Sequence, residues 1–226
     1  MAKKRSFNHQ KRNNYDKITT IQFLGVTQMP LKKIVMHWSA GGHNANSSDK
    51  RHYHEIVEGD GDRVGGDHLP EANNSTSDGH YAAHTRAFNT GAIGLSMAAM
   101  SGAKERPFSK GKYPITPVQL DVFVEMVAEY ADTYNIDITR ENVLSHAEVQ
   151  ITHGVKQNGK WDITWLPGMA KPGHPIEVGD HLREMIRAKQ VEIFHEDAPI
   201  MAGLNMDKFS EKLASHIGEF LKSQKA

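Results

Sequence analysis

The sequence predicts an α/β domain with a central mixed β-sheet flanked by helices, followed by a C-terminal helical extension. Three observations support this prediction. Short apolar runs of strand length occur around residues 34–36 and 92–97, a long amphipathic segment occupies residues 117–134, and long polar connections rich in glycine separate them. Strands interleaved with helices and long loops are typical of an α/β sheet domain.

Length and composition limit the possible organisation. A chain of 226 residues is enough for one sizeable domain with appendages. We expect a basic arm at residues 1–30, the α/β domain at residues 31–174, ending in the Pro-Gly-rich stretch PGMAKPGHP, and a helical extension at residues 175–226. The formal net charge of zero argues against a nucleic-acid partner.

The histidine and cysteine counts restrict the possible metal chemistry. The chain has no cysteine and 14 histidines. Disulfides and thiolate metal sites are therefore excluded, and any transition-metal site must use imidazole and carboxylate ligands.

The amino-terminal arm is basic and lacks an apolar segment of the signal-peptide type, and no apolar run reaches the ~18 residues that span a bilayer. We therefore expect cytoplasmic synthesis without an integral membrane segment. The arm is interpreted as a solvated tail, and contact with an anionic polymer or a membrane surface is the alternative.

The first half of the chain carries three strand patterns. In LKKIVMHWSAGG, a buried strand leads to His37 and then to small residues, so His37 is expected at the end of the strand. RHYHEIVEGDGDRV predicts a second strand that is closed by a Gly-Asp-Gly turn, with Tyr53 near its start. The small-residue run at 92–97 predicts a strand in the middle of the sheet.

Helix signals are strongest in the second half. Thr116 is predicted as an N-cap, with Pro117 at the first helical position and Gln119 completing a capping box. Two further amphipathic helices are predicted at residues 180–194 and 207–221. We expect them to pack on the domain or to mediate self-association, and action on membranes or anionic wall polymers is the alternative.

The stretch NVLSHAEVQITHGVKQNGKWDITW at residues 142–165 is predicted to be mainly a polar loop. A hydrolytic zinc site needs three protein ligands and an open position for water. His37, His146 and Asp162 could supply these ligands, and Lys160 could stabilise an oxyanion with help from Tyr53. Spacing alone is a weak signal, because single histidines are more often surface or hydrogen-bonded residues than ligands.

Four motifs in order resemble the type 2 N-acetylmuramoyl-L-alanine amidases, a group that includes phage amidase endolysins and peptidoglycan recognition proteins. These motifs are KKIVMHWSA, YHEIVEGDG, AAHTRAFNTGAIGLSM, and SHAEVQ followed by GKWD, and the resemblance covers about residues 31–168. It implies an amidase-like fold and a zinc-dependent enzyme that cleaves the amide between N-acetylmuramic acid and L-alanine of peptidoglycan.

The resemblance also implies residue roles. His37, His146 and Asp162 would bind one Zn²⁺ per chain, Lys160 and Tyr53 would be catalytic, and His84 and Asn89 would bind substrate. His153 is the alternative to His146.

The chain departs from the family pattern at Ser96, where some members carry a catalytic glutamate. A phage-type endolysin is therefore favoured, which would reach the cell wall after release, and a cytosolic wall-recycling amidase is an alternative. Two further alternatives are a non-catalytic peptidoglycan-binding module and a zinc hydrolase that acts on another amide. The type of stem peptide is not determined by these motifs.

Overall fold

The computed structural model describes residues 31–194, so the predictions for the basic arm and for the helix at 207–221 lie outside the described residues. The structure confirms the predicted mixed sheet flanked by helices, which has five strands in the order β3-β2-β4-β1-β5. β1 is parallel to both of its neighbours, and only the β2–β3 pair is antiparallel. The strands are β1 (Lys33–Trp38), β2 (Glu55–Val57), β3 (Arg63–Gly65), β4 (Ala92–Met97) and β5 (Val143–Ser145).

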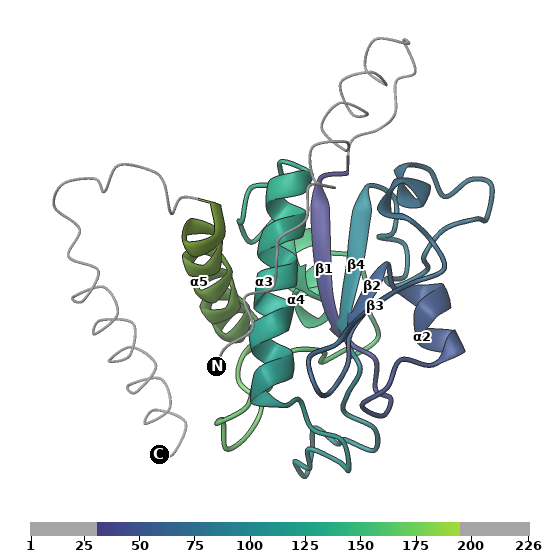
Figure 1. Cartoon of the computed structure of the whole chain (residues 1–226). Coiled ribbons are helices and arrows are strands. Elements are labelled where there is room, and N and C mark those ends of the chain that lie inside the picture. Colours follow the sequence, from purple (N-terminus) through teal and green to yellow (C-terminus); the bar gives the residue numbers. More distant parts are fainter. Residues whose placement is uncertain (1–30, 195–226) are drawn as a thin grey trace, which may run out of the picture. The chain divides into compact units, whose positions relative to one another are not determined.

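Alternation along β1 gives the sheet two different faces. Ile34 and Met36 belong to the large core formed with α3 (Pro117–Thr133) and α5 (Pro175–Phe194), which lie side by side in Figure 1. Val35 packs instead with Val149 of α4 (His146–His153). Because successive side chains point to opposite faces, His37 shares the face of Val35.

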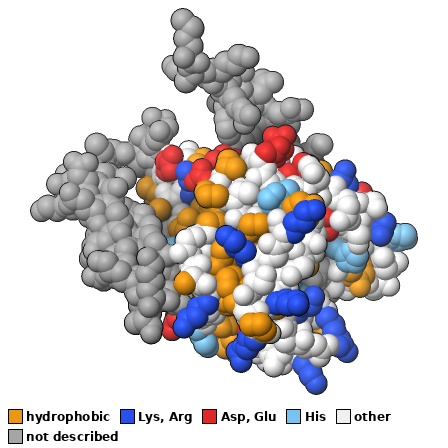
Figure 2. All heavy atoms as spheres, turned by 90° about the horizontal axis from the view of Figure 1, so that it is seen from below, with side chains coloured by type: hydrophobic (Ala, Val, Ile, Leu, Met, Phe, Trp, Pro, Cys, Tyr) orange, Lys and Arg blue, Asp and Glu red, His pale blue; other side chains and the backbone are white. Residues whose placement is uncertain are grey.

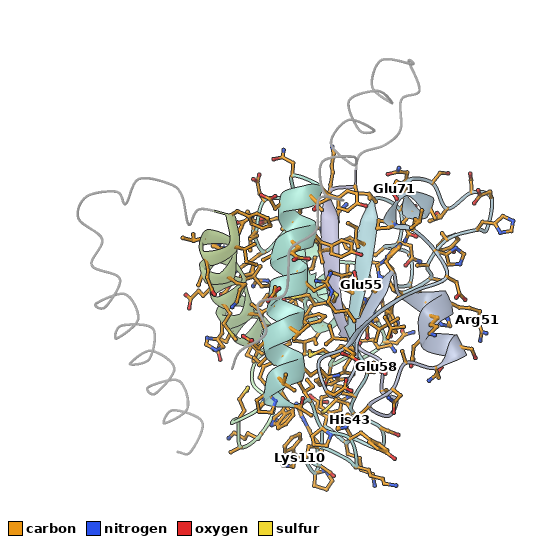
Figure 3. The ribbon with its side chains drawn as sticks, viewed as in Figure 1. His43, Arg51, Glu55, Glu58, Glu71 and Lys110 are labelled. Atoms are coloured by element: carbon orange, nitrogen blue, oxygen red, sulfur yellow. The ribbon has the colours of Figure 1, made fainter. Side chains whose placement is uncertain are left out.

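The predicted start of α3 is confirmed. The Thr116 side chain accepts from the Gln119 N–H, Pro117 opens the helix, and the capping box is complete. Glu55 of β2, labelled in Figure 3, accepts a hydrogen bond of 2.8 Å from the Tyr130 hydroxyl of α3. These contacts fix α3 against the sheet.

The Gly-Asp-Gly turn follows β2 as predicted, and it leads into β3, a strand that was not predicted and that pairs with β2. One local prediction needs correction. Residues 146–153 form α4 and not a loop. The Glu148 carboxylate accepts from the Ser145 N–H at the start of this helix, and Gly154 ends it in the left-handed conformation. Short helices α2 (Ser47–His52) and η2 (Pro70–Asn74) were not predicted.

Helix α5 confirms the prediction of a helix at residues 180–194 and begins at Pro175. Its buried residues Val178, Leu182 and Ile186 belong to the same core as α3 and the sheet. The core therefore continues past residue 174, where we expected the catalytic domain to end. Within residues 31–194, no helix combines the length and apolar character that crossing a membrane requires.

Candidate active site

His37, His146 and Asp162 meet at one edge of the sheet. His37 is the fifth residue of β1, and His146 directly follows β5 as the first residue of α4. Because β1 and β5 are parallel neighbours, their carboxyl ends lie together. The side chains are buried, and one donor atom from each lies within 4.8 Å of the others.

The distances fit a zinc ion. Asp162 Oδ2 lies 3.4 Å from Nδ1 of His37 and 3.3 Å from Nδ1 of His146. Two ligands that each lie about 2.0–2.1 Å from zinc at a tetrahedral angle are about 3.3 Å apart. Direct hydrogen bonds between charged partners are shorter, at about 2.7–2.9 Å. The donor atoms are therefore spaced as ligands around a cation.

Protonation also favours metal binding. Burial, with smaller contributions from His146 and Lys160, lowers the pKa of His37 to about 4. Burial opposes ionisation of Asp162, but its contacts with His146 and His37 hold the pKa of its carboxyl well below the usual range. A neutral imidazole and an ionised carboxylate are the forms that bind zinc.

Tyr53 borders the same cluster. Its ring centroid lies 5.1 Å from that of His37, and the side chain of Ser96 is a neighbour that slightly offsets the rise of its pKa. Ser96 is buried and pairs with His37 across the β1–β4 ladder. Burial raises the pKa of Tyr53, and the Asp162 and Asp49 carboxylates raise it further. The phenol therefore stays protonated at neutral pH.

Lys160 is exposed on the loop that leads to Asp162. Its charge is close enough to contribute to the lowered pKa of His37. The next residue, Trp161, packs edge-to-face on the buried Trp38, with ring centroids 4.8 Å apart. This contact fixes the loop beside the end of β1.

His84 and Asn89 lie close to the cluster. His84 is buried, and its Nδ1 is 3.2 Å from Nε2 of His37. Asn89 Oδ1 accepts a 2.7 Å hydrogen bond from the Thr85 N–H. These contacts shape the segment behind His37, and the predicted substrate contacts of both residues stay a prediction.

Two other histidines, His153 and His54, lie outside the cluster. His153 ends α4, where its Nε2 is 3.0 Å from the Glu141 carbonyl oxygen. His54 accepts from the Gly94 N–H through Nδ1 and donates to Asn73 through Nε2. The geometry therefore favours His146 over His153 as the third member of the cluster.

Sequence reasoning missed Thr85 and Gln157. Thr85 Oγ1 is 3.3 Å from Nε2 of His37, and Gln157 Oε1 is 3.0 Å from Nε2 of His146. Both side chains are buried. The sequence carries no signal for them, because each stands in a polar segment that resembles a surface loop.

Lysines surround the approach to this end of the sheet. Lys104, Lys110, Lys112 and Lys160 are exposed on the loops after β4 and before Asp162. Figure 3 shows Lys110 and His43 beyond the lower end of α3, and Figure 2 shows basic side chains spread across the face seen from below. This face suits a substrate with negatively charged groups.

Comparisons with known proteins found similar solved structures. Two solved structures are similar: AmiD from E. coli in complex with anhydro-N-acetylmuramic acid-L-Ala-D-gamma-Glu-L-Lys, and LysC from Clostridium intestinale. AmiD is 17% identical over 55% of this chain and 51% of its own, with a TM-score of 0.38. LysC is 16% identical over 71% of this chain and 85% of its own, with a TM-score of 0.40. The match to AmiD thus spans about half of that chain.

No curated protein matches the sequence. The family model described as N-acetylmuramoyl-L-alanine amidase matches residues 27–168, a span that includes His37, His146 and Asp162. Because this match covers more than half of the 226 residues, the chain belongs to the N-acetylmuramoyl-L-alanine amidase family.

Proposed function

We propose that this protein is a zinc-dependent amidase that hydrolyses the amide between N-acetylmuramic acid and L-alanine of peptidoglycan. The observation that carries the proposal is the buried cluster of His37, His146 and Asp162, with donor atoms 3.3 and 3.4 Å apart. The cluster lies inside the span that matches the amidase family.

The three clustered residues would hold one zinc ion through Nδ1 of each histidine and Oδ2 of Asp162. When bound, zinc supplies a water of lowered pKa and polarises the amide carbonyl. Tyr53 keeps its proton and can donate a hydrogen bond to the water or to the carbonyl oxygen. The Lys160 ammonium stabilises the negative charge that develops on that oxygen.

Ser96, the β4 residue that pairs with His37 of β1, supports a phage-type enzyme. Ser96 cannot act as a carboxylate base, and its side chain is a neighbour of Tyr53. Tyr53 therefore fills the assisting role beside the metal, and we propose an endolysin that acts on the cell wall after release.

Faster cleavage of intact wall polymer than of soluble muropeptides would support an endolysin, and the reverse preference would indicate wall recycling.

Digestion of purified peptidoglycan tests the activity. Zinc-loaded and chelator-treated protein are compared by separate assays for new L-alanine amino termini and for new reducing sugar ends. The amidase releases amino termini without reducing ends, and chelation abolishes the release until zinc is restored. A zinc-loaded protein that releases neither product would act on another amide, and a protein that binds no zinc and releases neither would be a binding module.

A further inference from the structure

A series of buried hydrogen bonds runs from the backbone of β4 to His37. His84 Nε2 lies 3.2 Å from the Ala92 carbonyl oxygen, and His84 Nδ1 lies 2.8 Å from Thr85 Oγ1. Nε2 of His37 faces the other end of this pair, 3.2 Å from His84 Nδ1 and 3.3 Å from Thr85 Oγ1. All three side chains are buried.

The Ala92 carbonyl sets the direction of these bonds. A carbonyl oxygen only accepts, so Nε2 of a neutral His84 must carry the proton and Nδ1 must accept. Nδ1 of His84 accepts a hydrogen bond from the Thr85 hydroxyl, whose oxygen then accepts one from the Nε2–H of His37, or it accepts one from that N–H directly. In both arrangements Nε2 of His37 is the donor, which leaves the lone pair of Nδ1 facing Asp162.

Gln157 acts on His146 in the same way. Its Nε2 donates to the Arg86 carbonyl oxygen at 3.0 Å, which fixes the orientation of the amide and turns Oε1 toward His146. Because Oε1 only accepts, Nε2 of His146 must donate and its Nδ1 carries the lone pair. Two independent contacts thus set the same tautomer in both histidines.

We propose that His84 and Gln157 are positioning residues that hold His37 and His146 in the Nε2-protonated tautomer, with both Nδ1 atoms ready to bind zinc. The proposal gives His84 a role behind the metal site. The proposal rests on the proposed function, because it assumes that the two histidines bind a zinc ion. Hydrogen bonds to the second nitrogen of a ligating histidine commonly change metal affinity by about 10–100-fold.

The packing of His84 explains why position 94 is a glycine. A Cβ atom on Gly94 would overlap the His84 ring. Glycine therefore leaves the space in β4 that brings His84 against His37.

Zinc titration of the full chain, with a competing chelator, tests the proposal. His84→Phe keeps an aromatic ring but removes the acceptor, so the Thr85 hydroxyl can turn and donate to Nε2 of His37. We expect a loss of zinc affinity of about 10–100-fold. Thr85→Val leaves His84 Nδ1 as an acceptor and should change affinity much less. His43→Gln is the matched control, because His43 also bonds a backbone carbonyl, that of Pro114, but lies outside the cluster.

Gln157 provides a second pair of variants. Gln157→Met removes the acceptor and should lower zinc affinity. Gln157→Glu keeps an oxygen facing His146 and should retain the zinc affinity of the wild type. This pair tests the proposal even if His84→Phe fails to fold.

Nitrogen-15 spectra of the metal-free protein report the tautomers directly. The wild type should show His37 and His146 protonated at Nε2, and His84→Phe should populate the Nδ1-protonated form of His37. A wild type with the proton on Nδ1, or unchanged zinc affinity in both His84→Phe and Gln157→Met, would overturn the proposal. A wild type that binds no zinc would overturn the proposed function as well, which distinguishes the two failures.

Discussion

Nη2 of Arg183 lies 2.7 Å from Oε1 of Glu148, and both side chains are almost completely buried. The other carboxylate oxygen of Glu148 accepts from the Ser145 N–H at 2.7 Å, and Nη1 of Arg183 donates to the Val143 carbonyl oxygen at 2.8 Å. The pair thus connects α5 to the residues immediately before His146. A helix beyond the family-matched span thereby supports the position of a proposed metal ligand.

Loss of this ion pair should be strongly destabilising. Arg183→Met leaves the Glu148 carboxylate buried without its partner, and removal of one member of a buried pair costs about 3–5 kcal/mol. Urea unfolding of the metal-free protein measures the effect. Lys189→Met is the matched control, because its ion pair with Glu192 lies at the surface and should contribute less than about 1 kcal/mol. Equal stability losses in the two variants would contradict the assignment.

Gly94→Ala should affect both stability and zinc binding. The added Cβ atom overlaps the His84 ring, so His84 must move away from His37. We expect a stability loss of about 1–3 kcal/mol, the usual cost of overpacking, together with weaker zinc binding. Gly65→Ala, at a strand position where nothing lies within 4 Å of the added atom, is the control and should retain zinc affinity.

Substitution of the candidate ligands should separate His146 from His153. His146→Ala removes one of the three clustered donors and should abolish stoichiometric zinc binding and hydrolysis, as should His37→Ala and Asp162→Ala. His153→Ala changes a side chain that bonds the Glu141 carbonyl and should keep its zinc. Metal content after gel filtration is the measurement. Full zinc in His146→Ala with loss in His153→Ala would reverse the assignment.

Lys160→Ala should reduce the rate but retain the metal. The exposed ammonium contributes no ligand, and its proposed role is to stabilise negative charge during the reaction. Removal of one such donor lowers kcat by a factor on the order of 100–1,000. Lys156→Ala removes another exposed lysine of the same loop and should have little effect on kcat. Loss of zinc from Lys160→Ala would show a structural role instead.

Acid should destabilise the metal-free protein. Burial lowers the pKa of His54 to about 4, whereas an imidazole in the unfolded chain has a pKa near 6.5. Between these pH values the unfolded state binds more protons, so the free energy of unfolding falls as the pH decreases from about 6.5 to about 4. Protonation of Nδ1 also removes the acceptor for the Gly94 N–H.

Urea unfolding at several pH values checks this prediction. His54→Gln should show a shallower loss of stability in this range, and His52→Gln, on the exposed side of α2, should match the wild type. A pH dependence that is the same in all three proteins would exclude His54 as a contributor.

The amino-acid sequence by itself determined several local elements and the candidate chemistry. Alternation in β1 separates Ile34 and Met36 from Val35 and His37, because the two-residue period of a strand is a local property. The cap of α3 at Thr116 likewise depends on neighbouring residues alone. The absence of cysteine restricted a metal site to imidazole and carboxylate.

Only the tertiary structure decided which of these groups meet. His146 and His153 stand at the two ends of α4, and the pairing of β5 with β1 brings only the first of them to His37. Thr85, Gln157 and Arg183 gain their roles through contacts between segments distant in the chain, so no local pattern marks them. The physical reason is that periodicity and capping act over a few residues. The spacing of the metal ligands and the histidine nitrogen that carries the proton depend instead on which backbone carbonyls and side chains the folded sheet brings within hydrogen-bond distance.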